Sequence, residues 1–142
     1  MKHLVLTLLI LLTFSYANAS RADDACGGTL IDYKPVQING ENVGQLHLYY
    51  NSTSGNNCAI FYHAGPTWGK PLITSVELYV CKPNRDNCGV WQRDPWWKRD
   101  DGKYSYHAGP VRIDGRDRCV KSVGYIEYKG KTGVAVSAVH CR

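Results

Sequence analysis

The chain has 142 residues, with 17 basic and 12 acidic side chains and a formal net charge of +5. In its most charged stretch, residues 93–118, the two signs are interleaved, which is typical of a solvated face and excludes a nucleic-acid groove from our prediction. Beyond the N-terminus no apolar run approaches the roughly 20 residues of a membrane-spanning helix, so no membrane span is predicted.

The N-terminus has the three parts of a secretory signal peptide. A short basic start, Met1-Lys2-His3, precedes an apolar run over 4–14 and the small residues Ala17-Asn18-Ala19, the pattern that a signal peptidase cleaves. We therefore predict a signal peptide over 1–19 and a secreted protein, with the extracellular space, the cell surface or the periplasm as its location. Residues 20–142 then form a single secreted β-domain with one core.

Alternating apolar and polar residues predict strands in this domain. On 45–50 the residues Leu46, Leu48 and Tyr50 share one face and Gln45, His47 and Tyr49 the other. On 74–81 the predicted inward residues are Val76, Leu78 and Val80, and the outward ones are Ser75, Glu77 and Tyr79. A terminal hairpin is predicted for 125–128 with 134–140 across the turn 129–133. Turn formers recur about every 8–12 residues, and no long helical pattern is present. The predicted fold class is all-β, a small disulfide-stabilised antiparallel β-sandwich or barrel.

The pentapeptide Tyr-His-Ala-Gly-Pro occurs twice, at 62–66 and at 106–110. Because proline locks its own φ and restricts the residue before it, we expect the same extended and then turned backbone to be built twice. Between the copies, 88–103 is too polar and irregular for a central strand. We interpret it as a long loop with exposed or half-buried aromatic residues.

Six cysteines in an exported chain of this size predict three disulfides, for which sequence alone allows fifteen connectivities. Cys81 and Cys88 bracket a string of turn formers that folds the two sulfurs together, so we pair them. Of the three remaining arrangements we prefer Cys26 with Cys58 and Cys119 with Cys141, since each closes a shorter loop. No two cysteines have the two-residue gap of a zinc site, so no metal is predicted.

For the histidines and aspartates of this sequence, a structural role is better supported than a catalytic one. His47, His63, His107 and His140 follow the signal peptide, and histidines with a lysine could cleave RNA by general acid–base chemistry if His47, His63 and His107 lay within about 7 Å in a cleft. Strand-filling or surface histidines are the preferred interpretation. No serine elbow or free cysteine is expected, and the aspartates of 94–101 have basic neighbours as ion-pair partners. We predict no enzyme, no catalytic residue and no cofactor.

The aromatic stretch towards the second pentapeptide is the main candidate binding site: Trp91, Trp96, Trp97, Tyr104 and Tyr106. Flat rings beside Asp and Arg offer a sugar both an apolar face and partners for its hydroxyls. Core packing is the competing interpretation. In an extended chain Trp96 and Trp97 point in opposite directions, so one of the two rings is expected to be exposed.

Several short segments resemble the spore-associated protein A family of filamentous actinobacteria: Cys26-Gly27, 50–53, Asn57-Cys58, 101–111, Cys119-Val120 and His140-Cys141. The resemblance implies a small secreted protein found at the spore surface, and it carries over no catalytic residue because the family has no settled activity. The predicted partner is a cell-surface or spore-coat polysaccharide. It also implies four family cysteines, matching Cys26, Cys58, Cys119 and Cys141, with Cys81 and Cys88 as an added pair. Hypotheses left open are a carbohydrate-binding or cell-envelope-binding module and a secreted hydrolase or toxin such as a ribonuclease.

Overall fold

The computed structural model describes residues 25–81, 88 and 97–141, which leaves the predicted signal peptide outside the described residues. Its elements are β1 (Thr29–Ile38), β2 (Glu41–Tyr50), β3 (Asn56–His63), the short 3-10 helix η1 (Gly65–Thr67), β4 (Leu72–Val80), β5 (Trp97–Tyr104), β6 (His107–Asp114), β7 (Cys119–Tyr128), β8 (Lys131–Val136) and β9 (His140–Cys141). Among these residues no helix is long and apolar enough to cross a membrane.

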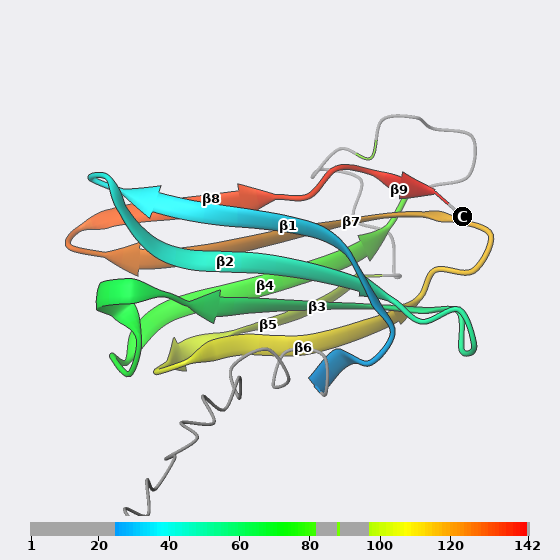
Figure 1. Ribbon diagram of the computed structural model, residues 1–142, viewed down its shortest axis with the longest axis horizontal. Coiled ribbons are helices and arrows are strands. Elements are labelled where there is room, and N and C mark those ends of the chain that lie inside the picture. The colour runs from blue at the N-terminus through cyan, green and yellow to red at the C-terminus, as the bar shows by residue number, and fades with distance from the viewer. Residues whose placement is uncertain (1–24, 82–87, 89–96, 142) are drawn as a thin grey trace, which may run out of the picture.

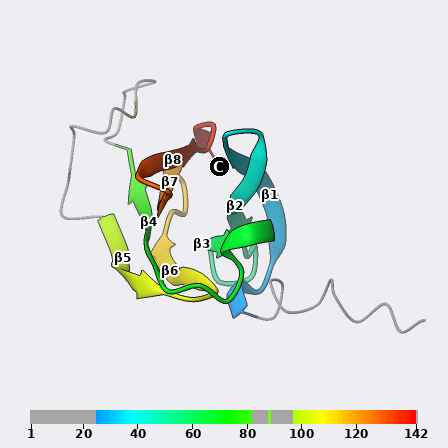
Figure 2. The same ribbon diagram turned by 90° about the vertical axis from the view of Figure 1, so that its left-hand side faces the viewer.

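The strands form two antiparallel sheets that face each other (Figure 1, Figure 2). The four-stranded sheet has the order β1-β2-β3-β6, and the five-stranded sheet has the order β5-β4-β7-β8 with β9 beside β7. The chain crosses from one sheet to the other after β3, β5 and β6. The predicted fold class is confirmed, in the form of a sandwich.

Side chains between the sheets form the main hydrophobic core, and Phe61 of β3 is at its centre with no exposed surface. Two glycines make room for the ring. A Cβ added to Gly44 of β2 would lie 2.4 Å from Phe61 Cζ, and one added to Gly124 of β7 would lie 2.3 Å from Phe61 Cδ2. Of the residues predicted to face inward on 45–50 and 74–81, all are buried except Tyr50, which is half-buried. Three residues predicted to face outward are buried as well: Tyr49, Ser75 and Tyr79.

The terminal hairpin is confirmed, but its turn is shorter than predicted. Lys129 and Gly130 both have left-handed φ angles, 51° and 72°, so a two-residue turn places Tyr128 opposite Lys131. The strand after the turn is therefore Lys131–Val136 instead of 134–140. Only His140 and Cys141 return to pair with β7, as β9.

The long loop predicted over 88–103 is wrong for its second half. Trp97–Tyr104 forms β5, which pairs with β4 along its whole length, from Tyr79 opposite Trp97 to Leu72 opposite Tyr104. The segment is too polar for a central strand, but β5 is at the edge of its sheet. Charged residues are common on edge strands because they discourage pairing with another chain.

The two pentapeptides do not adopt the same backbone. In the first, His63 ends β3 and Gly65-Pro66 enters η1. In the second, 107–110 lies within β6, with Gly109 at a φ of 89° and a cis Gly109-Pro110 bond. The prediction of one conformation built twice is therefore wrong, because the flanking residues continue as a strand after the second copy and turn after the first.

The three disulfides are Cys26–Cys58, Cys81–Cys88 and Cys119–Cys141, which are the three predicted pairs. The first ties the segment before β1 to β3. The second closes the end of β4, and the third joins β7 to β9. Three structural disulfides are consistent with an extracellular location.

Candidate functional site

Of the predicted aromatic site, the three residues that the structure describes, Trp97, Tyr104 and Tyr106, do not come together. Trp91 and Trp96 lie outside the described residues. Trp97 is half-buried and packs against the cluster of Tyr79, Cys81 and Cys88. Tyr104 is at the opposite end of β5, roughly 20 Å away at about 3.3 Å per residue. Tyr106, in contrast, is 50% exposed.

Tyr104 has a structural role instead of an exposed binding face. Its ring packs against the main core, and its hydroxyl donates a hydrogen bond of 2.5 Å to Asp100 Oδ1. The other carboxylate oxygen of Asp100 accepts a bond of 2.6 Å from the backbone N–H of Gly109. Hydrogen bonding to Asp100 raises the pKa of Tyr104. This arrangement links β5 to β6 where the two sheets meet.

Tyr106 has an aromatic partner that the sequence analysis missed. The ring of Trp68 lies edge to face against it, with centroids 5.0 Å apart and an interplanar angle of 63°. Trp68 is 56% exposed, the same as Val134 and more than the other large apolar residues of the described chain. We call Trp68 and Tyr106 the end pair. The sequence contained a signal for this exposure, because Trp68 lies in the turn Pro66-Thr67-Trp68-Gly69 and not on a strand that would direct its side chain into the core.

The loop that carries Trp68 is anchored on both sides of that residue. Before it, the hydroxyl of the fully buried Thr67 donates a hydrogen bond of 2.7 Å to the carbonyl of Val43. After it, the N–H of Gly69 donates a bond of 2.8 Å to the carbonyl of Ser105, next to Tyr106. Both members of the end pair are therefore presented from a backbone that is already fixed.

A buried histidine, His63, connects the same loop to β4 through two hydrogen bonds. His63 is 2% exposed; its Nδ1 lies 3.0 Å from the carbonyl of Thr67 and its Nε2 lies 2.7 Å from the hydroxyl of Thr74. The carbonyl can only accept, so Nδ1 carries the proton and Nε2 accepts from Thr74. Burial lowers the pKa of His63 below its usual 6.5, so the neutral form is the one that the fold stabilises.

Acidification is therefore expected to destabilise the protein through His63. The unfolded chain binds a proton near pH 6.5 and the folded chain only at lower pH, so stability is complete above 6.5 and is lost as the pH falls below it. Chemical unfolding measured between about pH 8 and pH 5 should show this slope. The slope should be clearly smaller in His63→Gln. It should be largely retained in His107→Gln, a histidine on the outer face whose charge lowers the His63 pKa less than burial does. Equal slopes in wild type and His63→Gln would contradict the assignment.

The two pentapeptides meet side by side at the end pair. Tyr62 is opposite His107 in the β3–β6 ladder, and the N–H of His63 donates a hydrogen bond of 2.8 Å to the carbonyl of Tyr106. The first copy leads into the loop of Trp68, while the second begins with Tyr106 itself. The repeat thus places the end pair. No family model, curated protein or solved structure matches this chain.

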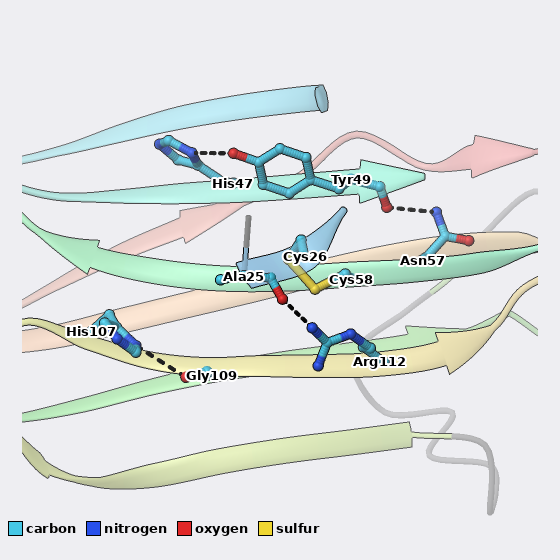
Figure 3. The surroundings of a disulfide bond; sticks show 9 residues. All are labelled: Ala25, Cys26, His47, Tyr49, Asn57, Cys58, His107, Gly109 and Arg112. Atoms are coloured by element: carbon cyan, nitrogen blue, oxygen red, sulfur yellow. Dashed lines mark hydrogen bonds between the residues drawn. A yellow bond between two sulfur atoms is a disulfide. The ribbon is translucent and has the colours of Figure 1, made fainter. Parts of the chain in front are cut away.

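A second group of rings crosses the outer face of the four-stranded sheet. We call it the ring row: Tyr33, His47, Tyr62 and His107, with successive centroids 5.2, 5.2 and 5.6 Å apart. Figure 3 shows His47 and His107 on the same side of the sheet as the Cys26–Cys58 disulfide. Neighbouring rings meet edge to face, and His47 and Tyr62 are half-buried, so the end pair offers the more accessible rings.

The histidines do not form the cleft that a ribonuclease would need. His47 on β2 and His107 on β6 are separated by β3, so their strands are about 10 Å apart. His63 points between the sheets, and His140 lies 2.9 Å from Asp32 Oδ2. Within the described part of the chain, no group of three or more His, Cys, Asp or Glu side chains could hold a metal ion.

Proposed function

We propose that this chain is a secreted, non-catalytic protein that binds a cell-surface polysaccharide through the end pair. The observation that carries the proposal is the exposure of Trp68 and Tyr106, 56% and 50%, on a backbone fixed by hydrogen bonds before and after Trp68. The disulfides and the resemblance to the spore-associated protein A family support an extracellular, surface-associated role.

Aromatic side chains suit this role for a physical reason. The C–H faces of a sugar ring bury apolar area against a flat ring, and Trp and Tyr present such area with few rotatable bonds. The anchored loop also lowers the entropy lost on binding, because neither ring has to be brought into place by a backbone rearrangement. Exposed aromatic groups of this kind mark interaction sites more often than isolated apolar residues do.

Replacing Trp68 or Tyr106 by alanine is expected to weaken retention on the polysaccharide that the wild type binds by about tenfold or more, the loss typical of an aromatic residue central to an interface. The measurement is a pull-down on chitin, cellulose and peptidoglycan. Tyr33→Ala is the matched control, since Tyr33 is 43% exposed but belongs to the ring row. Thermal unfolding of each variant checks that the fold is intact.

Two results would contradict the proposal. If the wild type is retained on none of the polysaccharides, the protein does not bind them and is a surface component without this activity. Retention that survives both end-pair substitutions and is lost in Tyr33→Ala would move the binding surface to the ring row.

A further inference from the structure

A hollow of about 520 Å³ lies beside the loop of the end pair. It is bounded by the start of β4, by Lys103 on β5 and by the β7–β8 hairpin. Its lining includes Pro71, Leu72, Ile73, Tyr128, Glu127 and three lysines. Pro71 is three residues beyond Trp68, and Lys70, between them, has its Nζ 5.7 Å from the centre of the Tyr128 ring. The hollow and the end pair are therefore supported by one loop.

The charges around the hollow are mainly positive. Lys103, Lys129 and Lys131 line it together with a single acidic residue, Glu127. Lys131 Nζ lies 2.6 Å from Asn39 Oδ1, an amide oxygen that leaves its charge uncompensated. Lys103 is exposed and has no hydrogen-bond or ion-pair partner among the described residues.

Lys129, in contrast, has an ion-pair partner. Its Nζ lies 3.3 Å from Glu41 Oε2 and 5.0 Å from the centre of the Tyr128 ring. Glu41 is outside the lining, so its carboxylate compensates Lys129 without bringing a negative charge into the hollow. In the part of the chain that the structure describes, Lys103 and Lys131 have no ion-pair partner, and Glu127 is the one carboxylate of the lining, so the hollow keeps a net positive charge that attracts an anion.

Apolar surface lies among these charges. Ile73 is 45% exposed, and Leu72, Pro71 and the buried Tyr128 also belong to the lining. A sugar that carries an acid group matches this combination, because its ring C–H groups can cover Ile73 while the acid group meets the lysines. A neutral sugar would leave the two ammonium groups without an anionic partner in the ligand.

We propose that the polysaccharide is anionic and that the hollow takes its carboxylate or sulfate groups while the end pair holds a neighbouring sugar ring. This inference rests on the proposed function. It adds the class of the ligand and a second contact site to it.

The test compares one sugar backbone in three charge states: dextran, carboxymethyl dextran and dextran sulfate, each immobilised for a retention assay. The wild type should be retained on the acidic forms more strongly than on dextran, and the two acidic forms separate a preference for carboxylate from one for sulfate. The double variant Lys103→Gln/Lys131→Gln should lose about tenfold in retention on the preferred acidic form, since each exposed charge contact contributes a few-fold. Raising the salt should reduce the acidic preference, as screening predicts.

The matched control is Lys98→Gln, an exposed lysine at the other end of β5. It removes a charge from the same strand outside the hollow and should keep nearly full retention. An equal loss in Lys98→Gln and in a single Lys103→Gln variant would show attraction by net charge and would overturn the inference. Equal retention on neutral and acidic dextran would overturn it as well.

The two proposals fail in different ways. If Trp68→Ala abolishes retention while the double lysine variant behaves as wild type on all three dextrans, the binding function stands and the anionic inference falls. If wild type is retained on no polysaccharide of either charge, both fall. Circular dichroism and thermal unfolding of the lysine variants, all on the surface, confirm that losses are not due to misfolding.

Discussion

Replacing Phe61 by alanine is expected to lower the free energy of unfolding by about 3–5 kcal/mol, the cost of removing a fully buried aromatic ring. The ring has no exposed surface and fills the space over Gly44 and Gly124, one on the neighbouring strand and one in the opposite sheet. Neither glycine has a side chain that could move into the cavity. The site can therefore collapse only by shifting strands, which places the expected loss towards the upper end of that range.

Guanidinium unfolding of Phe61→Ala and wild type gives this difference directly. Tyr33→Ala is the control, since it removes a ring of similar size that is 43% exposed, and it should change stability far less. Gly124→Ala tests the same packing from the other side, because its methyl group would overlap the Phe61 ring and should also destabilise the fold. A loss below about 1 kcal/mol in Phe61→Ala would show that the sheets do not depend on this ring.

Removing the disulfides one at a time is expected to destabilise the protein in the order of their loop lengths. The sequence separations are 32 for Cys26–Cys58, 22 for Cys119–Cys141 and 7 for Cys81–Cys88. In the chain-entropy model these loops correspond to about 4, about 3 and about 2 kcal/mol. Since a domain of this kind has a net stability of roughly 5–15 kcal/mol, loss of the first bond is a large fraction of the total.

The measurement is the free energy of unfolding of three double-alanine variants, with wild type under non-reducing and reducing conditions as the reference. Cys26→Ala/Cys58→Ala should be the least stable, and Cys81→Ala/Cys88→Ala should stay closest to wild type. A reversed order would mean that restriction of the unfolded chain is not the main effect of these bonds.

The loop that carries Trp68 and borders the hollow is held in place by buried hydrogen bonds before any ligand binds. His63, Thr67 and Thr74 lie inside the sandwich, yet their hydrogen bonds fix the loop whose surface carries Trp68. A substitution of one of these buried residues should therefore weaken binding, although the residue itself does not contact the ligand. The pH dependence assigned to His63 would then appear in retention as well as in stability.

Much of the fold was predictable because it depends on local patterns. Alternation along 45–50 and 74–81 reports which face of a strand is buried, and this does not require knowledge of the partner strand. The glycine in the turn 129–130 and the turn formers between Cys81 and Cys88 likewise act over a few residues. Shorter loops also favoured the disulfides that form, since nearby cysteines meet most readily.

The tertiary structure was needed wherever a property depends on residues distant in the chain. The charged segment 97–104 forms a strand because it can pair with β4 at the edge of the sheet. The sequence of the segment does not show that this edge is available. Tyr49 and Tyr79 were placed outward by alternation, but they are 1% and 8% exposed. The candidate site shows the same limit. Trp68 and Tyr106 meet only because β3 pairs with β6, and that pairing is set by the burial of Phe61 and the core around it, a property of the whole fold.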